Sequence, residues 1–213
     1  MPIASNLKAI QISLPKEVTL VAVSKTKPNT DILEAYHAGQ RIFGENKAQE
    51  LALKAEELPK DISWHMIGHL QTNKVKFIAP FTSLIHGVDS IKLLKEINKR
   101  AVQNNRTIDC LLQVHIASEN TKFGFGINDV ESTLHSAKQF ENIKIVGLMG
   151  MATFTDDIEQ VTQEFKRLKA LFERVKNEQI TTLSMGMSGD YQLAIEQGST
   201  MIRVGSAIFG HRN

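Results

Sequence analysis

Short apolar segments alternate with longer amphipathic segments along the whole chain. The apolar segments are rich in β-branched and other strongly hydrophobic residues, and they cover residues 18–25, 41–45, 63–68, 83–89, 108–117, 143–152, 181–187 and 201–210. Most of the segments between them repeat hydrophobic residues at spacings of three and four, which is typical of helices. In residues 157–178, for example, Val161, Phe165, Leu168 and Phe172 share one face. The pattern predicts eight strands that alternate with helices.

The predicted helices have start signals in several places. They cover residues 31–39, 47–58, 73–79, 90–103, 129–140, 157–178 and 191–198. Asp89 and Ser90 precede one of them, and Asn128 and Asp129 precede another, which are residue types that cap helix N-termini. A further helix is expected near residues 3–13, and it could cover the place where no helix follows the eighth strand.

Eight alternating units favour a closed barrel. Each helical crossover returns the chain so that the next strand runs in the same direction, which gives a parallel sheet. Eight units in 213 residues match the lower size limit of the (β/α)8 (TIM) barrel, about 200 residues. The α/β alternative is an open doubly wound sheet. We expect one barrel domain over residues 1–213 with an extra N-terminal helix.

Composition narrows the classes of partner. The chain has 25 basic and 23 acidic residues and a formal charge of +2, which gives no overall reason to expect nucleic acid or an anionic membrane as a partner. No leader-like segment or membrane-spanning apolar run is present, so a cytoplasmic protein is expected. Cys110 lies in the apolar run IDCLLQV and is expected to be a buried, inert thiol. The predicted helices show no long apolar seam, which favours a monomer.

Polar residues gather where the predicted strands end, at the rim that carries the active site in this type of barrel. Val21, Val23 and Lys25 share strand parity, so Lys25 faces the interior if the two valines do. A lysine there is costly unless its amine is neutral, paired or used covalently. Lys25 could therefore be a nucleophilic amine, or it could simply pair with a carboxylate such as Glu45.

A second group of small residues follows strands seven and eight. Ser188 lies in a Gly-rich turn before a predicted helix, and Gly205 and Ser206 follow the neighbouring strand. Backbone amides, hydroxyls and the helix start in such a place favour a phosphate group. Arg203 lies on strand eight between this group and Lys25. An interior lysine opposite a phosphate site offers the two anchor points that pyridoxal 5′-phosphate (PLP) requires.

Seven motifs distributed in order over the chain resemble the pyridoxal phosphate homeostasis protein family. They are AVSKTKP at 22–28, FGENKAQE at 43–50, WHMIGHLQTNK at 64–74, SENTKFGF at 118–125, GLMGMAT at 147–153, SMGMSGDY at 184–191 and IRVGSAIFG at 202–210. The resemblance implies the barrel of alanine racemase-type (fold type III) PLP enzymes without their second domain.

The resemblance also implies roles for individual residues. Lys25 would hold PLP as a Schiff base. Ser188, Gly205 and Ser206 would bind the phosphate, and Gly186 and Met187 would shape its loop. Arg203 would face the pyridine nitrogen and Asn46 would lie beside the ring, while His69 and Lys122 would be rim residues.

The expected function is a carrier that buffers PLP, and possible recipients of that PLP are PLP-dependent apo-enzymes. Two-base racemisation needs an acid or base on each face of the substrate, and the resemblance implies that the second base comes from a domain that this chain lacks. Lys27 is a candidate for the transimination that would release PLP. The alternatives are a PLP-dependent amino-acid racemase of low activity, and a Schiff-base aldolase that uses Lys25 with Glu45 as base. We expect no metal site.

Overall fold

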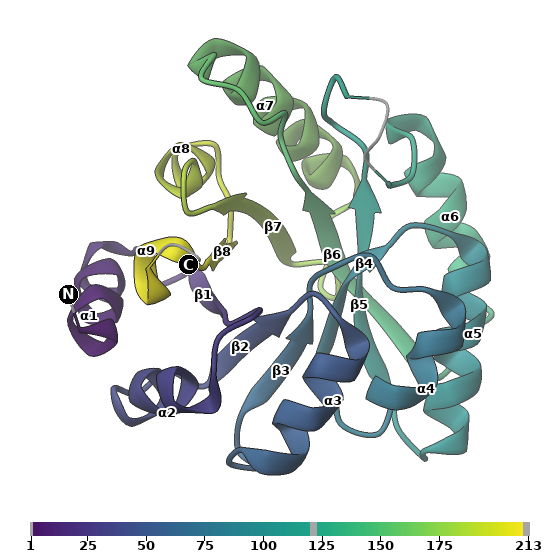
Figure 1. Ribbon diagram of the computed structural model, residues 1–213. Helices are drawn as coiled ribbons and strands as arrows, with labels where there is room; N and C mark the ends of the chain where they lie inside the picture. The colour runs from purple at the N-terminus through teal and green to yellow at the C-terminus, as the bar shows by residue number, and fades with distance from the viewer. Residues whose placement is uncertain (1, 120–122, 211–213) are drawn as a thin grey trace.

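The strands close into a parallel barrel (Figure 1). The computed structural model describes residues 2–119 and 123–210. Each strand pairs in parallel with the next, and β8 pairs with β1 through the register Val21↔Arg203. This pairing excludes the open sheet and confirms the predicted (β/α)8 barrel. The strands are β1 (Thr19–Val23), β2 (Ile42–Glu45), β3 (Ser63–Met66), β4 (Leu84–Val88), β5 (Ile108–Val114), β6 (Ile143–Gly150), β7 (Thr182–Met187) and β8 (Met201–Val204).

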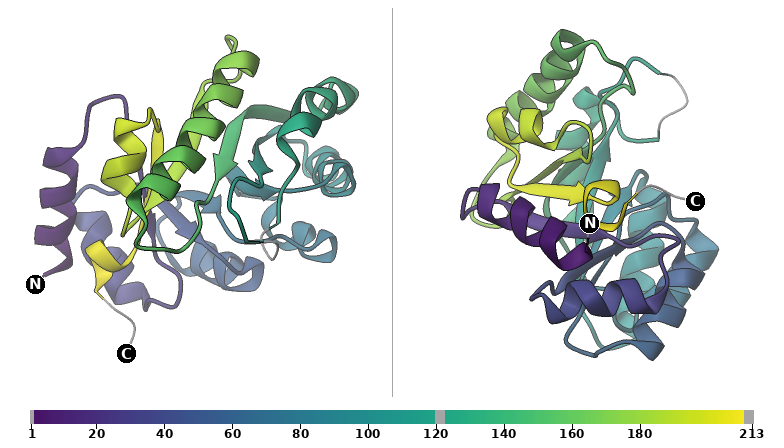
Figure 2. Two further views of the ribbon diagram at one scale, coloured as in Figure 1. Left: turned by 90° about the horizontal axis from the view of Figure 1, so that it is seen from above. Right: turned by 60° about the vertical axis from the view of Figure 1, so that its left-hand side comes forward.

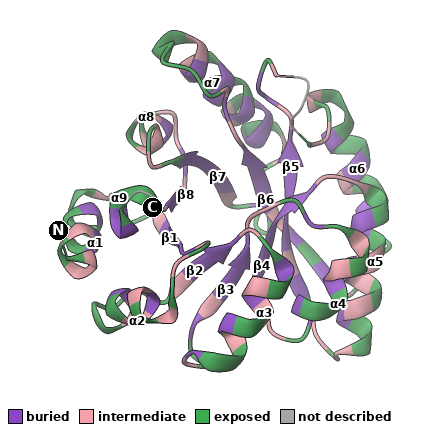
Figure 3. Cartoon of the chain, in the orientation of Figure 1, coloured by how far each residue is buried: buried purple, intermediate pink, exposed green. Residues whose placement is uncertain are grey.

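Helices surround the barrel and turn their apolar faces toward it, so that buried residues concentrate on the strands and on the inner helix faces (Figure 3). Ser90 caps α5 by accepting the Leu93 amide, as the sequence predicts. Asp157 caps α7 through the Gln160 amide. The helical elements are α1 (Ile3–Ser13), α2 (Asn29–His37), α3 (Ala48–Glu57), η1 (Thr72–Lys74), α4 (Val75–Ile78), α5 (Ile91–Gln103), η2 (Ile127–Asp129), α6 (Val130–Ala137), α7 (Ile158–Val175), α8 (Tyr191–Glu196) and α9 (Ser206–Phe209).

The end of the chain differs from the prediction. Strand β8 stops at Val204, and the residues expected to extend it form the short helix α9. Ile208 and Phe209 are buried at this turn, and Asn6 on α1 donates its side-chain amide to Ile208 O at 3.0 Å. Helix α1 therefore packs beside α9 (Figure 2) and covers this part of the barrel, as expected of the N-terminal helix.

The barrel interior holds apolar side chains at one end and polar ones toward the other. A small apolar cluster fills it, consisting of Val21, Leu84, Leu111, Met149 and Met201. The strand register then fixes which polar residues face inward, because directly paired residues of parallel strands point to the same face. His65 pairs with Leu84, Ser184 with Met149, and Arg203 with Val21. These three polar residues therefore lie inside the barrel.

Candidate functional site

A cavity of about 950 Å³ opens at the carboxyl ends of the strands. All six residues predicted to bind a cofactor line it, namely Lys25, Asn46, Ser188, Arg203, Gly205 and Ser206. Lys27, His69 and Met187 line it as well. Lys122 lies outside the described residues. The structure thus brings together residues from strand ends that are up to 181 positions apart in the chain, as the barrel prediction requires.

Lys25 follows β1 in a tightly held turn. Val21 lies in the barrel interior and Val23 lines the cavity, which confirms the predicted parity that turns Lys25 inward. Thr26 adopts the left-handed conformation with φ 64°, which is uncommon for a β-branched residue. Its amide donates to Glu50 Oε1 at 2.7 Å, and the Lys27 amide donates to Ser24 O at 3.0 Å. The chain is therefore fixed on both sides of Lys25.

Glu45 does not take part in the cavity. It points to the outer side of the barrel, where Lys54 Nζ and Ser24 Oγ donate to its Oε1 at 2.8 and 2.6 Å. Lys54 also donates to Ser24 O at 2.9 Å and to Glu50 Oε1 at 2.7 Å. Burial raises the pKa of Glu45, against the lowering effect of these hydrogen bonds. Both roles considered for Glu45, as the partner of Lys25 and as an aldolase base, are therefore wrong.

The loops after β7 and β8 are joined by a direct contact. The Gly205 amide donates to Ser188 Oγ at 3.0 Å. Gly186 has φ +94°, and a Cβ atom there would lie 2.6 Å from Ala194 Cβ, so only glycine fits this turn. The Met187 amide donates to Asp190 Oδ1 at 2.6 Å, which places a carboxylate just before α8. That carboxylate weakens the expectation that the start of α8 attracts an anion.

Arg203 is a buried cation that faces the cavity. Its side chain donates to Ser184 O and Oγ at 3.1 and 2.6 Å and to Gly150 O at 3.2 Å. Within the described residues it forms no ion pair. Burial lowers its pKa to about 10, although the charge of Asp190 opposes this. Because a buried charge is costly without an opposite charge, the cavity favours an anionic ligand.

A chain of polar side chains runs from Arg203 into the barrel interior. Ser184 Oγ lies 3.3 Å from His86 Nδ1, and His86 Nε2 lies 3.0 Å from His65 Nδ1. Burial lowers the pKa of His65 to about 3 and that of His86 well below its ordinary value. Both imidazoles are therefore neutral near pH 7. Strand parity places His86 on the same face as the interior residue Leu84, but it does not connect these residues to Arg203.

The loop between β6 and α7 forms part of the cavity wall and is held by a buried carboxylate. Glu164 on α7 accepts the Thr153 amide at 2.6 Å, the Thr153 hydroxyl at 2.7 Å and the Gln160 side chain at 3.1 Å. Burial acts to raise the pKa of Glu164, but these hydrogen bonds outweigh it and lower the pKa below the ordinary 4.5. Phe154, the next residue, is 97% exposed at the cavity edge.

Glu164→Gln is expected to destabilise the protein by about 1–3 kcal/mol near pH 7, because charge-assisted hydrogen bonds to a buried acceptor are lost. A lowered pKa contributes stability that is present above the ordinary value and lost as pH falls through the folded value. The difference in urea midpoint between wild type and variant should therefore be constant above about pH 5 and shrink in acid. A difference that grows in acid would contradict this assignment.

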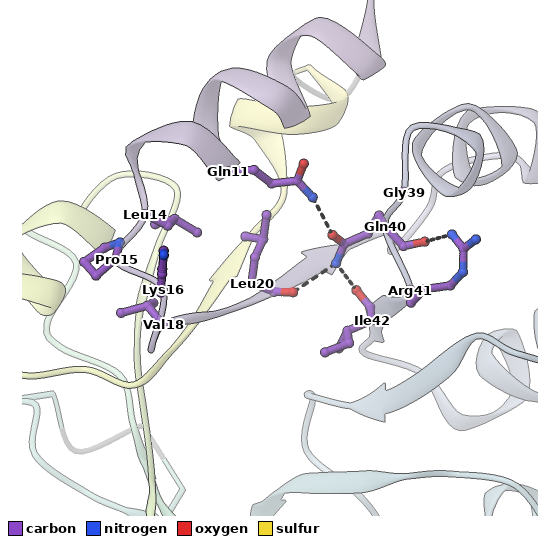
Figure 4. Close-up of a pocket in the computed structure, with 10 residues that line it drawn as sticks. All are labelled: Gln11, Leu14, Pro15, Lys16, Val18, Leu20, Gly39, Gln40, Arg41 and Ile42. Atoms are coloured by element: carbon purple, nitrogen blue, oxygen red, sulfur yellow. Dashed lines mark hydrogen bonds between the residues drawn. The ribbon is translucent and has the colours of Figure 1, made fainter.

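A groove of about 410 Å³ lies at the opposite end of the barrel, beside α1 (Figure 4). Gln40 donates to the carbonyls of Leu20 and Ile42 at 2.9 and 2.6 Å and accepts from Gln11 at 3.3 Å. Arg41 is paired with Asp61 at 3.0 Å. Since these groups satisfy one another, the groove offers no comparable site for chemistry.

Other kinds of site find no support in the part of the chain that the structure describes. It contains no group of three or more side chains placed to hold a metal ion. Cys110 is fully buried, and burial raises the pKa of its thiol, in agreement with the predicted inert cysteine. Among the helices in residues 2–119 and 123–210, none combines the length and the apolar character needed to cross a membrane.

Comparison with known proteins places the chain in a family. The model of the alanine racemase N-terminal domain matches residues 2–213. The pyridoxal phosphate homeostasis protein of Aquifex aeolicus (strain VF5) is 39% identical over 197 residues, which cover 91% of this chain and 86% of that relative. The chain belongs to the pyridoxal phosphate homeostasis protein family. The predicted resemblance is confirmed.

Solved structures agree with membership of the pyridoxal phosphate homeostasis protein family. PipY of Synechococcus elongatus PCC7942 without PLP matches with a TM-score of 0.93 and 36% identity, covering 98% of this chain and all of that one. The structure of PipY with PLP bound matches with a TM-score of 0.87 over the same shares. An alanine racemase of Clostridium difficile 630 has a TM-score of 0.80 at 13% identity, covering 99% of this chain and 56% of that one, which shows the shared fold alone.

Proposed function

We propose that this protein binds PLP through Lys25 and buffers or delivers the cofactor without a dedicated substrate. The proposal rests on one cavity that brings three features together. They are a lysine that turns inward, the two joined loops of small residues after β7 and β8, and a buried arginine without an ion-pair partner among the described residues. The PLP-bound structure of PipY supports the same ligand. The recipients that we propose are PLP-dependent apo-enzymes of the cytoplasm.

The residues fit the chemistry of the cofactor. PLP, when bound, supplies an aldehyde that condenses with a primary amine to form a Schiff base. Lys25 offers that amine. Ser188 and Ser206 offer hydroxyl donors for the phosphate beside Gly205, whose amide donates to Ser188 Oγ. Asn46 lies at the end of the neighbouring strand to flank the ring. The positive charge of Arg203 complements the charge of the ligand.

An arginine at the pyridine nitrogen would weaken racemase chemistry without abolishing it. A guanidinium donates hydrogen bonds and keeps its proton, so it leaves a pyridine nitrogen that faces it unprotonated. This weakens the ring as an electron sink compared with a site that places an acid there. Neither tyrosine lines the cavity to serve as a second base, since Tyr36 donates to Asp61 at 2.7 Å and Tyr191 packs against the core.

The alanine racemase domain match keeps a low-activity racemase as the second candidate. That candidate predicts turnover of one amino acid that depends on Lys25. The carrier predicts no preferred amino acid. A screen of the loaded protein against single amino acids with chiral detection separates the two.

The visible absorbance spectrum of the purified protein, recorded with and without added PLP, tests the proposal directly. Borohydride reduction followed by peptide mass mapping then locates any adduct. We expect a yellow protein whose reduced adduct lies on the peptide that contains Lys25. A protein that stays colourless with added PLP would refute the proposal.

A further inference from the structure

A histidine faces the cavity from the side opposite the β7 and β8 loops. His69 follows β3, lines the cavity, and its side chain is 40% exposed. Its Nδ1 lies 3.0 Å from Asp89 Oδ2, and the Asp89 side chain is only 12% exposed. A carboxylate in this position favours the proton on Nδ1 and leaves Nε2 as the basic nitrogen.

The orientation of the His69 ring is also fixed by stacking. The ring of Phe123 lies 3.9 Å from it, centroid to centroid, at an interplanar angle of 15°. Gln113, which lines the same cavity from β5, donates to Phe123 O at 2.8 Å and holds the stacked residue in place. Asp89 and Phe123 together therefore hold His69 in one orientation, which is unusual for a side chain with this much exposure.

His69 lies close to the Lys25 end of the cavity. Strands β1, β2 and β3 are neighbours, so the ends that carry Lys25 and His69 are about 10 Å apart at two strand spacings. A Cβ atom on Gly68 would lie 2.4 Å from Asn46 O. The backbone just before His69 therefore lies directly against the backbone that follows β2, the strand next to β1.

Within residues 2–119 and 123–210, the other ionisable side chains that line the cavity are Lys25, Lys27, Asp156, Asp190 and Arg203. Arg203 only donates, the Lys27 amine donates to Phe209 O at 2.8 Å, and Asp190 accepts the Met187 amide. Asp156 is exposed to solvent on the loop between β6 and α7. Imidazole is the side-chain group best suited to accept and return a proton near neutral pH.

We propose that His69, oriented by Asp89, is the acid–base group that acts when an incoming primary amine replaces the Lys25 amine in its Schiff base with PLP. This proposal rests on the proposed function. His69 Nε2 takes a proton from the incoming ammonium. The freed lone pair then forms a C–N bond to the cofactor carbon that is bonded to the Lys25 nitrogen. The incoming nitrogen then passes a second proton, by way of His69, to the Lys25 nitrogen, and the C–N bond to Lys25 breaks. Lys25 leaves as an ammonium with the two protons that the incoming amine gave up, so that charge and electrons balance without an oxidant. His69 thereby makes charged amines, the common form at neutral pH, usable acceptors of the cofactor.

The test compares two nucleophiles on PLP-loaded protein at pH 7.5. Ethylamine is protonated there and must lose a proton, whereas semicarbazide is already uncharged. His69→Ala is expected to slow exchange with ethylamine roughly 100-fold, within the range of general acid–base catalysis, and to leave the semicarbazide rate within about twofold. Added imidazole should restore the ethylamine rate. His135→Ala, which removes an exposed histidine on α6, is the matched control and should change neither rate.

A second variant and a spectroscopic measurement test the same role of His69. His69→Gln replaces the alanine variant if that one does not fold. In unloaded wild-type protein, the ¹⁵N signals of His69 should show that Nδ1 carries the proton. In unloaded Asp89→Asn, this tautomer should no longer be preferred. Equal slowing of both nucleophiles, no slowing of either, or a proton on Nε2 would overturn the role of His69. Failure of the proposed function is distinct, since wild type would then show no loading.

Discussion

Lys25→Ala is expected to abolish the borohydride-stable PLP adduct completely. The reason is that Lys25 turns into the cavity on the same strand parity as Val21 and Val23, next to loops suited to a phosphate. Without its amine, no C–N bond can form and only non-covalent binding remains. The measurement is intact-protein mass after incubation with PLP and reduction, which should show one added cofactor in wild type and none in the variant.

Lys27→Ala is the matched control, because Lys27 lines the same cavity two residues away. Its amine donates to Phe209 O at 2.8 Å, so it is engaged at the cavity edge. The variant should keep the adduct on Lys25 and release PLP more slowly if Lys27 takes part in transimination. An adduct that persists in Lys25→Ala and disappears in Lys27→Ala would reverse the assignment. Unchanged loading and release rates in Lys27→Ala would remove any role for this residue.

Lys54→Met is expected to cost about 3–5 kcal/mol of folding free energy near pH 7, the usual effect of removing one partner from a buried ion pair. Lys54 is the cation between Glu45 and Glu50, and its side chain is 8% exposed. It also holds Ser24 O, next to Lys25. The variant should therefore load PLP more slowly even where it is still folded. Chemical denaturation and the rate of adduct formation measure the two effects.

The pH dependence identifies the cause of this loss. The folded pKa of Glu45 is raised, so its contribution to stability is fully present below its ordinary value of 4.5 and is lost as pH rises through the folded value. Loss of Lys54 raises that pKa further. The difference between wild type and Lys54→Met should hence be larger at pH 7 than at pH 4. Lys60→Met, which removes an exposed lysine, should show neither the loss nor the pH effect. A loss that is equal at both pH values would indicate that packing, not charge, is responsible.

Hydrophobic periodicity was enough to predict the barrel, because each strand is buried on both faces and each helix on one. The end of the chain was misjudged for a physical reason. Residues 201–210 form one apolar run, and an apolar run of this length does not reveal where a strand gives way to a buried helical turn. What separates β8 from α9 is the turn at Gly205 and the packing of Ile208 and Phe209 near α1.

Strand parity placed Lys25 correctly, and the same rule could have placed Glu45. Lys25 shares parity with two interior valines, whereas Glu45 alternates with Gly44, whose missing Cβ would lie 3.0 Å from interior Val21. Glu45 must therefore face outward, toward Lys54. The contacts of Arg203 could not be predicted in this way. They reach Ser184 on β7 and Gly150 on β6, and Ser184 in turn contacts His86 on β4. Only the register of the closed barrel shows which of these residues meet.

The polar chain inside the barrel has one direction in which the Ser184 hydroxyl proton finds its acceptor within the chain. Arg203 can only donate, so Ser184 Oγ accepts from it, and the Ser184 hydroxyl proton then has His86 Nδ1 as its acceptor. His86 consequently carries its proton on Nε2 and donates to His65 Nδ1, which leaves the His65 proton on Nε2. In this direction, each of two histidines that are neutral near pH 7 takes one tautomer, and the sequence of donors begins at the Arg203 guanidinium. Each hydrogen bond of this chain then points from the cavity toward the barrel interior, so a charge at the cavity wall orients neutral side chains deep inside the barrel.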